Sequence, residues 1–333
     1  MTTVLLTCAG QRVDVLVAFR LAGARVLAAD LNPVAPTLFH ADLALSPPPV
    51  DDAGYLDFVA AAVRDHDVSL VVPLTDLDQL VLSRGRDRLE GATVLLPPPE
   101  VIELTRDKYQ AHRFFVDRGF GSPPTWLPDA LPEEVPFPVL VKSRYGFGSR
   151  DIHLVGDREQ LDFFLRYTAV PSMVQRVCEG EEFSIDVFSD LEGRCLNAIP
   201  RTMIESKGGE SIKGRTLKDR TLIELGRDVA EALGIAGPAT IQCYRDESGN
   251  HELTDVNARF GGAFPLPLAA GGEYPMLALA LARGERPEPR VGVFREGVLM
   301  TRFFWQVCVG PDGESEAAPR AGALSELGTV GRP

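Results

Sequence analysis

The chain has 333 residues, which is long enough for two or three subdomains with substantial hydrophobic cores. Hydrophobic residues make up 45% and charged residues 24%, as is usual for a soluble globular enzyme, and the net charge of −13 argues against general nucleic-acid binding. We expect no membrane attachment and no secretion, because the sequence shows no membrane-length apolar run and no signal peptide. The five scattered cysteines form no Cys-x-x-Cys pair and indicate neither a zinc site nor a disulfide framework, so we expect a reduced, cytoplasmic protein.

Short apolar strands alternate with helical segments over residues 1–105, and this alternation predicts a parallel, doubly wound sheet. The predicted strands are Thr3–Cys8, Arg25–Ala29, Ser69–Val72 and Thr93–Leu96, and the predicted helices are Val13–Leu21, Tyr55–Arg64 and Leu77–Leu82. Gly10 follows the first strand, but the Gly-x-Gly-x-x-Gly pattern of dinucleotide sites is absent. A dinucleotide-dependent oxidoreductase therefore stays only as an alternative.

Proline-rich segments follow a predicted helix at Asp107–Arg118 and mark a boundary near residue 120. Two α+β units are expected beyond this boundary. The first has strands Val139–Lys142, Ile152–Val155 and Met173–Val177 with helix Arg158–Tyr167; the second has strands Phe183–Phe188, Ala239–Tyr244 and Glu252–Asn257 with helix Leu222–Leu233. The predicted domains are residues 1–105, 106–180 with the linker helix 107–118, and 181–309, and the composition of 310–333 predicts a disordered tail.

The segment Glu252–Gly262 combines strand periodicity with polar side chains. Asp255, Asn257 and Arg259 are spaced two residues apart, so in a strand all three project from one face. A carboxylate and an amide oxygen suit a hard cation such as Mg²⁺, and an arginine suits phosphate. A solvated strand face with three polar groups explains this segment alone equally well.

Lys142 ends an apolar strand and is followed by the loop Ser143-Arg-Tyr-Gly-Phe-Gly-Ser-Arg150. Gly146 and Gly148 allow the backbone to approach an anion, and Ser149 adds a hydroxyl donor. This pattern suits a triphosphate site. An ordinary hairpin turn beside an exposed lysine is the alternative.

Three further polar positions interrupt apolar strands or follow them. Gln175, with the backbone of Arg176–Val177, could pair with an adenine edge, and Glu182 could accept hydrogen bonds from ribose hydroxyls. Taken alone, an acidic turn between two strands explains this segment better. Gln242 lies between apolar neighbours in its strand, so it is either hydrogen-bonded in the core or directed into a site.

The segment from Arg201 to Arg220 is basic within an acidic chain. It has six bases against three acids and contains glycines, a composition typical of a mobile loop that closes over an anionic ligand. We favour a functional role for Arg201, whereas a solvated basic loop explains the other residues equally well.

Taken together and in this order, these segments resemble the ATP-grasp superfamily, specifically the carbamoyl-phosphate-synthetase-like carboxylate–amine ligases. The resemblance extends from Thr3 to about Val309. It implies a Rossmann-like α/β pre-ATP-grasp domain followed by the two α+β subdomains of an ATP-grasp fold. The chain is therefore expected to be an enzyme that uses ATP as a co-substrate with Mg²⁺ or Mn²⁺.

The resemblance also implies a role for each matching residue. ATP would be bound by Lys108, Lys142, Gly146, Gly148, Ser149, Gln175, Val177 and Glu182; the metal by Gln242, Asp255 and Asn257; and the reacting groups by Arg259 and Arg201. Three positions depart from the family pattern: Ser143 replaces a frequent proline, Asp151 a common glycine, and Asp255 the usual glutamate. The shorter Asp255 side chain puts the binding of two metal ions in question.

These expectations predict an ADP-forming ligase that makes an amide from a small carboxylate and an amine through an acyl phosphate. Two alternatives stay open, a non-catalytic ATP-binding protein and a ligase whose acceptor is not an amine. A homodimer is possible because dimers are common among enzymes. The sequence does not identify the acid or the amine.

Overall fold

The computed structural model describes residues 1–146, 151–207, 210–303 and 306–311. The contacts divide the chain into two compact units. The first unit comprises residues 1–96 and 273–288 with the described residues after 301, and the second comprises residues 97–272 and 289–301. The mixed α/β and α+β architecture confirms the predicted fold class, while the predicted domain boundaries stay predictions.

The first unit is built on a parallel sheet with the strand order β3-β2-β1-β4-β5. Its strands are β1 (Thr3–Thr7), β2 (Arg25–Ala29), β3 (Leu43–Leu45), β4 (Val68–Pro73) and β5 (Thr93–Val94). Every residue of β1 is buried, as expected for a central parallel strand that is covered on both faces. The doubly wound sheet predicted from the alternating pattern is therefore present.

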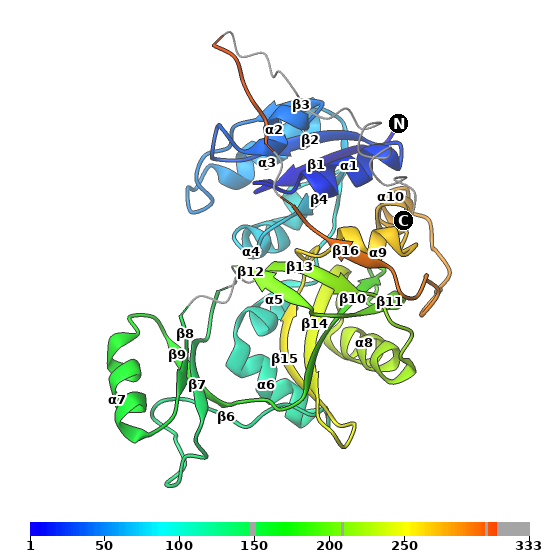
Figure 1. The fold of residues 1–333 in the computed structure, drawn as a ribbon. Helices are drawn as coiled ribbons and strands as arrows, with labels where there is room; N and C mark the ends of the chain where they lie inside the picture. Colours follow the sequence, from blue (N-terminus) through cyan, green and yellow to red (C-terminus); the bar gives the residue numbers. More distant parts are fainter. Residues whose placement is uncertain (147–150, 208–209, 304–305, 312–333) are drawn as a thin grey trace. The chain divides into compact units, whose positions relative to one another are not determined.

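Helices from both ends of the sequence complete the first unit (Figure 1). They are α1 (Val13–Leu21), α2 (Pro36–His40), α3 (Tyr55–Asp65), α4 (Gln79–Arg84), the short 3-10 helix η1 (Arg86–Arg88) and α10 (Tyr274–Ala282). The apolar α10 contacts both α1 and β4. Helix α10 begins 180 residues after the end of β5 and yet packs with the first sheet, which local sequence patterns do not reveal.

The turn after β1 differs from a dinucleotide site in its hydrogen bonds. The carboxylate of Asp30, at the end of β2, accepts from the backbone N–H of Gly10 at 2.7 Å and of Asn32 at 2.8 Å. An acidic residue near this position of a dinucleotide site would bind a ribose hydroxyl. Because both Asp30 oxygens already stabilise backbone turns, the geometry disfavours the oxidoreductase alternative.

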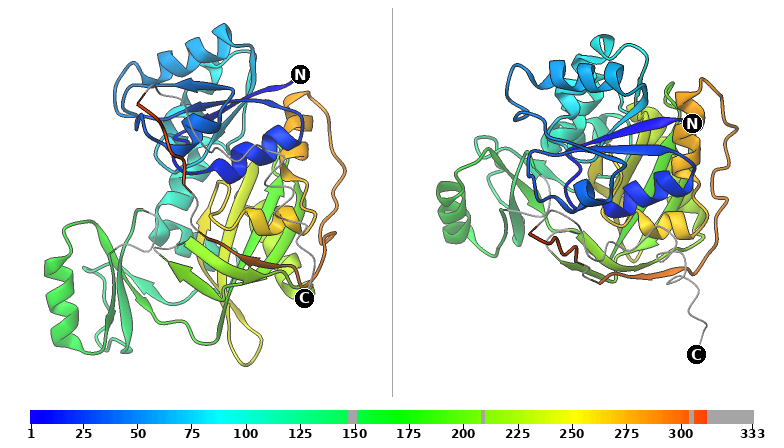
Figure 2. Two further views of the ribbon diagram at one scale, coloured as in Figure 1. Left: turned by 45° about the horizontal axis from the view of Figure 1, so that its top comes forward. Right: turned by 90° about the horizontal axis from the view of Figure 1, so that it is seen from above.

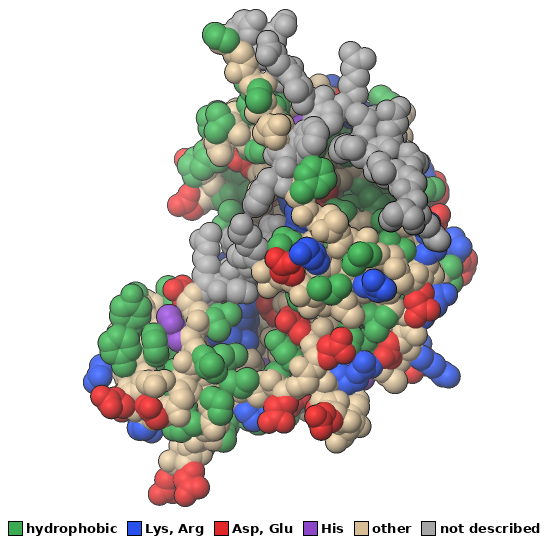
Figure 3. All heavy atoms as spheres, in the orientation of Figure 1, with side chains coloured by type: hydrophobic (Ala, Val, Ile, Leu, Met, Phe, Trp, Pro, Cys, Tyr) green, Lys and Arg blue, Asp and Glu red, His purple; other side chains and the backbone are tan. Residues whose placement is uncertain are grey.

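The second unit contains a small antiparallel sheet with the order β6-β9-β7-β8. Its elements are β6 (Thr125–Trp126), β7 (Val139–Ser143), β8 (Ile152–Val155), β9 (Ser172–Arg176) and α7 (Arg158–Tyr167). The buried side chains Val139, Val141, Val155, Leu161 and Val174 pack α7 against one face. Hydrophobic side chains also gather on the outside of α7, as the green spheres of Figure 3 show.

A larger antiparallel sheet of the second unit has the order β11-β10-β14-β15 (Figures 1 and 2). Its strands are β10 (Glu181–Ser189), β11 (Cys195–Thr202), β14 (Gly237–Arg245) and β15 (His251–Asn257). Helix α8 (Arg220–Leu233) contacts β10 and β11, and helices α5 (Pro99–Arg106) and α6 (Lys108–Asp117) contact β15. The alternating pattern predicted β10, β14 and β15, and the structure adds β11.

Helix α8 is fixed at both ends by local sequence. The Asp219 carboxylate caps its first turn by accepting from the backbone of Thr221 and Leu222, and Gly234 ends it in the left-handed conformation, with φ of 71°. Between these caps the apolar side chains of α8 share a core with Phe183, Ile185 and Val187 of β10. This core covers one face of the larger sheet, and polar residues lie on the other face.

The remaining elements of the second unit border that polar face. Strands β12 (Glu205–Lys207) and β13 (Glu210–Arg215) form a hairpin, and β16 (Leu299–Thr301) pairs with β13. The short helix α9 (Pro265–Ala269) contacts β16. The segment from Arg201 to Arg220, which the sequence indicated as a basic loop, is thus largely strand.

Candidate functional site

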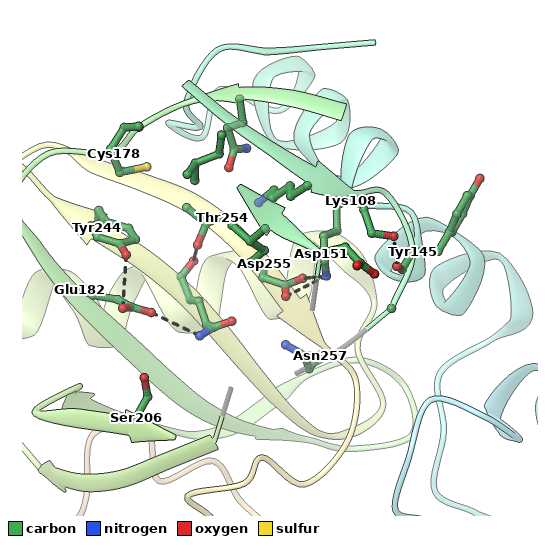
Figure 4. A pocket seen from close by; sticks show the side chains of 18 of the residues that line it. Lys108, Tyr145, Asp151, Cys178, Glu182, Ser206, Tyr244, Thr254, Asp255 and Asn257 are labelled. Atoms are coloured by element: carbon green, nitrogen blue, oxygen red, sulfur yellow. Dashed lines mark hydrogen bonds and ion pairs between the residues drawn. The ribbon is translucent and has the colours of Figure 1, made fainter. Parts of the chain in front are cut away.

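A cavity of about 460 Å³ lies within the second unit, between the polar face of the larger sheet, α6 and the small sheet (Figure 4). Ten of the thirteen predicted site residues line it. They are Lys108, Lys142, Gly146, Gln175, Val177, Glu182, Gln242, Asp255, Asn257 and Arg259. The structure places Arg201 outside the lining, whereas Gly148 and Ser149 lie outside the described residues.

Strand alternation builds the polar wall of this cavity. In β10, Phe183 and Ile185 face α8, so Glu182, Ser184 and Asp186 face the opposite side. The register pairs these three residues with Tyr244, Gln242 and Thr240 of β14, and it pairs Ser184 also with Arg201 of β11. Polar residues from three strands therefore form rows across one face of the sheet.

The same rows extend to β15 and bring the predicted metal ligands together. Gln242 is opposite Asp255, and Thr240 is opposite Asn257. A register shift follows Gln242, where the ladder becomes irregular. Because Gln242, Asp255 and Asn257 all line the cavity, the structure brings these three residues together as the sequence predicts.

Lys108 reaches this group from the first turn of α6. The Asp107 carboxylate caps the helix by accepting from the backbone of Tyr109 and Gln110, so Lys108 is the first helical residue. Its ammonium nitrogen lies 2.9 Å from both carboxylate oxygens of Asp255, and Figure 4 shows the two side chains directed at each other. Burial opposes ionisation of Asp255, but the charge and hydrogen bonds of Lys108 outweigh burial and lower the pKa of Asp255.

Lys142 is a second ammonium group in the same cavity, and only 8% of the residue is exposed. It is the penultimate residue of β7, which places it at the start of the glycine loop. Burial lowers the pKa of Lys142 to about 8; the Asp255 carboxylate opposes this shift and the Lys108 ammonium adds to it. Two basic groups around one carboxylate make this end of the cavity suitable for an anionic ligand.

Glu182 marks the other end of the polar wall. Its carboxylate accepts a hydrogen bond from the Tyr244 hydroxyl at 3.3 Å and from the Gln242 amide at 3.4 Å (Figure 4). Burial raises the pKa of Glu182, and the Tyr244 hydrogen bond and the charge of Arg201 oppose this shift. With its amide nitrogen directed to Glu182, Gln242 keeps its amide oxygen for a ligand.

The residues around the end of β9 form another part of the cavity wall. Gln175 is buried, and its amide nitrogen donates to the Thr125 hydroxyl at 2.8 Å. This bond fixes the side chain against β6, so the Gln175 amide nitrogen is committed within the protein. Val177 and Cys178 follow in the lining, and burial raises the pKa of the Cys178 thiol to about 12, which keeps it protonated.

The root of the glycine loop is attached to α6 through one carboxylate. Asp107 accepts from the Arg144 guanidinium and from the Tyr145 hydroxyl, the latter at 3.0 Å. The backbone N–H of Lys108 donates to the Arg144 carbonyl at 3.0 Å. This arrangement joins the segments that carry Lys108 and Lys142, a connection that the sequence alone does not indicate.

The two predicted catalytic arginines occupy different surroundings. Arg259 lines the cavity and donates to the Asn257 amide oxygen at 3.1 Å. Arg201 is only 3% exposed and pairs with Asp186 at 2.7 Å, and the Asp186 carboxylate also accepts from Thr240 at 2.8 Å. The geometry therefore gives Arg201 a structural partner, and its catalytic role stays a prediction.

Sequence reasoning missed several residues of the cavity wall. Strand alternation could have indicated Tyr244, which is two residues from Gln242 and shares its face. No sequence signal indicated Met203 and Ser206, which reach the cavity from the end of β11 and from β12. These positions depend on the fold of the hairpin and not on a local pattern.

Comparisons with known proteins agree with this geometry. Residues 168–302 match the family model described as ATP-grasp in the biosynthetic pathway with Ter operon, and residues 4–95 match the PylC-like N-terminal domain. Residues 168–302 of the chain thus match an ATP-grasp family. This match agrees with the family that the sequence predicts.

Individual relatives of this chain are distant. The carbamoyl phosphate synthase large chain of Clostridium botulinum is 26% identical over 210 residues, which are 57% of this chain and 18% of that protein. The chain thus spans about a fifth of the length of the curated relatives it matches. No helix among the described residues is long and apolar enough to cross a membrane.

Solved structures with the same fold cover most of the chain. The L-amino acid ligase of Bacillus licheniformis has a TM-score of 0.68 at 21% identity, and covers 89% of this chain and 78% of that one. The biotin carboxylase domain of Hydrogenobacter thermophilus 2-oxoglutarate carboxylase, determined with MgADP, has a TM-score of 0.72 at 18% identity, with 89% and 73% covered. At these identities the likeness establishes the fold alone.

Proposed function

We propose that this ATP-grasp protein is an ADP-forming ligase that joins a small carboxylate to an amine. The observation that carries the proposal is the convergence of Lys108 and Lys142 on Asp255 within one cavity. Buried ammonium groups beside the Asp255 carboxylate suit a bound triphosphate and a hard cation. The L-amino acid ligase of the same fold supports an amino acid as one substrate.

The nucleotide would lie along the polar wall, with its phosphates at the lysines. Lys142 and Lys108 provide positive charge from β7 and α6, and the described part of the glycine loop ends at Gly146, which has φ of 112°. The ribose would be placed near Glu182, and the base near Val177 and Cys178. The Gln175 side chain bonds to Thr125, so we assign the recognition of adenine at this point to the Val177 backbone.

The chemistry of Gln242, Asp255 and Asn257 fits Mg²⁺ or Mn²⁺. One carboxylate and two amide groups provide hard oxygen donors from adjacent positions of β14 and β15. A bound cation would supply neutralisation of the charge on the β- and γ-phosphates. Asp255 is the single carboxylate of this set, so the residues provide less anionic charge than two metal ions would normally require.

The reaction would proceed in two displacements. A carboxylate oxygen of the first substrate attacks the γ-phosphorus of ATP, ADP leaves with the electrons of the broken bond, and an acyl phosphate results. The amine nitrogen then attacks the acyl carbon, phosphate leaves, and the nitrogen loses a proton to give the amide. Arg259 and Lys142 would hold the transferred phosphoryl group, so positioning and charge neutralisation supply most of the catalysis.

The acid and the amine would bind where the hairpin meets the cavity. Met203 and Ser206 line this part of the wall, and Arg201 lies in the same row of the sheet as Gln242 and Asp255. One apolar and one hydroxyl side chain favour a small substrate with mixed polarity. We retain Arg201 as a candidate for acceptor binding.

The proposal is tested by ADP release from Mg-ATP with amino acids and small carboxylic acids, supplied singly and in pairs. We expect release that requires an acid and rises with an amine. Asp255→Ala should reduce the rate by a factor on the order of a hundred or more, because it removes the only carboxylate of the metal set.

Asp228→Ala is the matched control. Asp228 is a carboxylate on α8, at the opposite face of the larger sheet, and it pairs with the exposed Arg227. This variant should keep the ADP release of the wild type. ATP binding without ADP release for any acid–amine pair would favour the non-catalytic alternative, and release with an acid and an alcohol would favour a non-amine acceptor.

A further inference from the structure

The proposed metal ligands already have cationic partners within the chain. The Lys108 ammonium lies 2.9 Å from both oxygens of Asp255, and Arg259 donates to the Asn257 amide oxygen at 3.1 Å. Two of the three oxygen-bearing side chains assigned to the metal are therefore engaged by a lysine and an arginine. Gln242 differs, since its side chain donates to Glu182 through the amide nitrogen.

The Lys108–Asp255 pair is well shielded from solvent. The two side chains are 15% and 20% exposed, so water and salt weaken their attraction less than at the surface. An ammonium group that contacts both carboxylate oxygens competes with a divalent cation for the negative charge of these oxygens. Among the described ranges, no group of three or more His, Cys, Asp or Glu side chains could hold a metal, so a cation at Asp255 would depend on amide oxygens as well.

We infer that Lys108 and Arg259 are resident counter-ions of the metal ligands, and that they make divalent-cation binding depend on the nucleotide. Without nucleotide, Lys108 holds Asp255 and Arg259 holds Asn257. Phosphate oxygens provide alternative acceptors for both cationic groups, which then leave the ligand oxygens to the metal. This inference rests on the metal ligands assigned in the proposed function.

A thermodynamic consequence follows from this exchange. If nucleotide frees the ligands, the cation and the nucleotide each tighten the binding of the other by the same factor, about 5- to 150-fold in typical coupled sites. Without nucleotide, a divalent cation must compete with an ammonium group for Asp255. Removing that ammonium should therefore strengthen the binding of the free cation, the reverse of its effect on ATP.

The test measures Mn²⁺ binding to the full chain without nucleotide, from the electron paramagnetic resonance signal of free Mn²⁺. We expect Lys108→Met to bind Mn²⁺ at least about tenfold more tightly than the wild type. Lys108→Gln should show the same gain with a different neutral side chain. Lys108→Arg, which keeps a cation at this position, should bind as weakly as the wild type.

Two controls separate this exchange from a general charge effect. Arg227→Met removes one positive charge from α8, on the opposite face of the sheet, and should leave Mn²⁺ binding unchanged. Adding Asp255→Asn to Lys108→Met should abolish the gain. Equal Mn²⁺ affinity in the wild type and both neutral Lys108 variants, or an equal gain in Arg227→Met, would overturn the inference.

The two proposals fail in different ways. Mn²⁺ binding is measured without turnover, so the expected pattern in the Lys108 variants supports the counter-ion role even if no substrate pair releases ADP. Conversely, ADP release with unchanged Mn²⁺ affinity in the Lys108 variants would leave the ligase proposal intact and contradict the counter-ion role.

Discussion

The two faces of the larger sheet in the second unit differ in chemistry, although they are made by the same strands. Toward α8, β10 directs Phe183, Ile185 and Val187, all of which are buried among apolar neighbours. Toward the cavity it directs Glu182, Ser184 and Asp186. Strand alternation thus assigns stability to one face and ligand chemistry to the other.

The division between the two faces is incomplete, because the polar face also contains a buried ion pair that supports the fold. Arg201 and Asp186 are each only 3% exposed to solvent. Thr240 donates a further hydrogen bond to the Asp186 carboxylate. The pair adjoins Gly261, where an added side chain would lie 2.3 Å from the Thr240 hydroxyl. Close packing at this point shows that part of the polar face supports the fold.

The largest effect is expected from Arg201→Met. This change leaves the Asp186 carboxylate buried without its cation and should lower the free energy of unfolding by about 3–5 kcal/mol in urea denaturation. The double variant Asp186→Leu with Arg201→Met removes both charges and should recover most of that loss. Equal stability of Arg201→Met and the wild type would show that the pair does not support the fold.

ADP release by the double variant then separates the two roles of Arg201. Normal release would limit Arg201 to structure. Loss of release in a fully folded double variant would support the predicted role of Arg201 at the acceptor site.

A loss of similar or somewhat smaller size is expected on the apolar face. Ile185 is fully buried, and its Cγ2 atom lies 2.5 Å from the place where a side-chain carbon on Gly226 of α8 would be, so the helix packs closely here. Ile185→Ala should lower the free energy of unfolding by about 2–5 kcal/mol. Nucleotide affinity of the folded protein, measured by calorimetry, should not change because Ile185 is directed away from the cavity.

Ser184→Ala is the matched change on the adjacent residue of the other face. The buried Ser184 hydroxyl makes no hydrogen bond in the described structure, so its removal should alter stability by less than about 1 kcal/mol. A loss in Ser184→Ala comparable to that in Ile185→Ala would contradict the assignment of stability to the α8 face.

The same alternation explains which features were predictable. Period-two patterns predicted β10, β14 and β15, and the positions of Asp255 and Asn257 on one face of β15 followed from them. Only the family resemblance added Gln242 of β14 to this set. The pattern has no information on register, so the pairing of Arg201 with Asp186 and of Lys108 with Asp255 could not be predicted. Both pairs join residues from different elements, and the second spans 147 positions of the chain.

Other features lay beyond local patterns for a different reason. Helix α10 and strand β16 are apolar segments whose partners are far away in the sequence, in the first sheet and in the β12 hairpin respectively. The residues Met203 and Ser206 enter the cavity only because that hairpin folds beside it. Tertiary packing, and not propensity, decides these positions.

The smallest expected effect is a pH dependence, in which ligand affinity and stability change in opposite directions. Burial lowers the pKa of Lys142 to about 8, so this group loses its proton between pH 7 and pH 9 in the folded protein. Phosphate binding requires the ammonium form. Calorimetry should therefore show ATP affinity falling up to about tenfold between pH 7 and pH 9.

Stability should change in the other direction for the nucleotide-free protein. Because the folded pKa of Lys142 lies below its usual value of 10.5, the unfolded chain binds more protons between pH 8 and that value, and the contribution of Lys142 to stability rises with pH there. Lys142→Met should abolish both trends, and Lys142→Arg should keep ATP affinity constant because its charge persists. ATP affinity that falls equally with pH in Lys142→Arg would assign the titration to another group and separate Lys142 from phosphate binding.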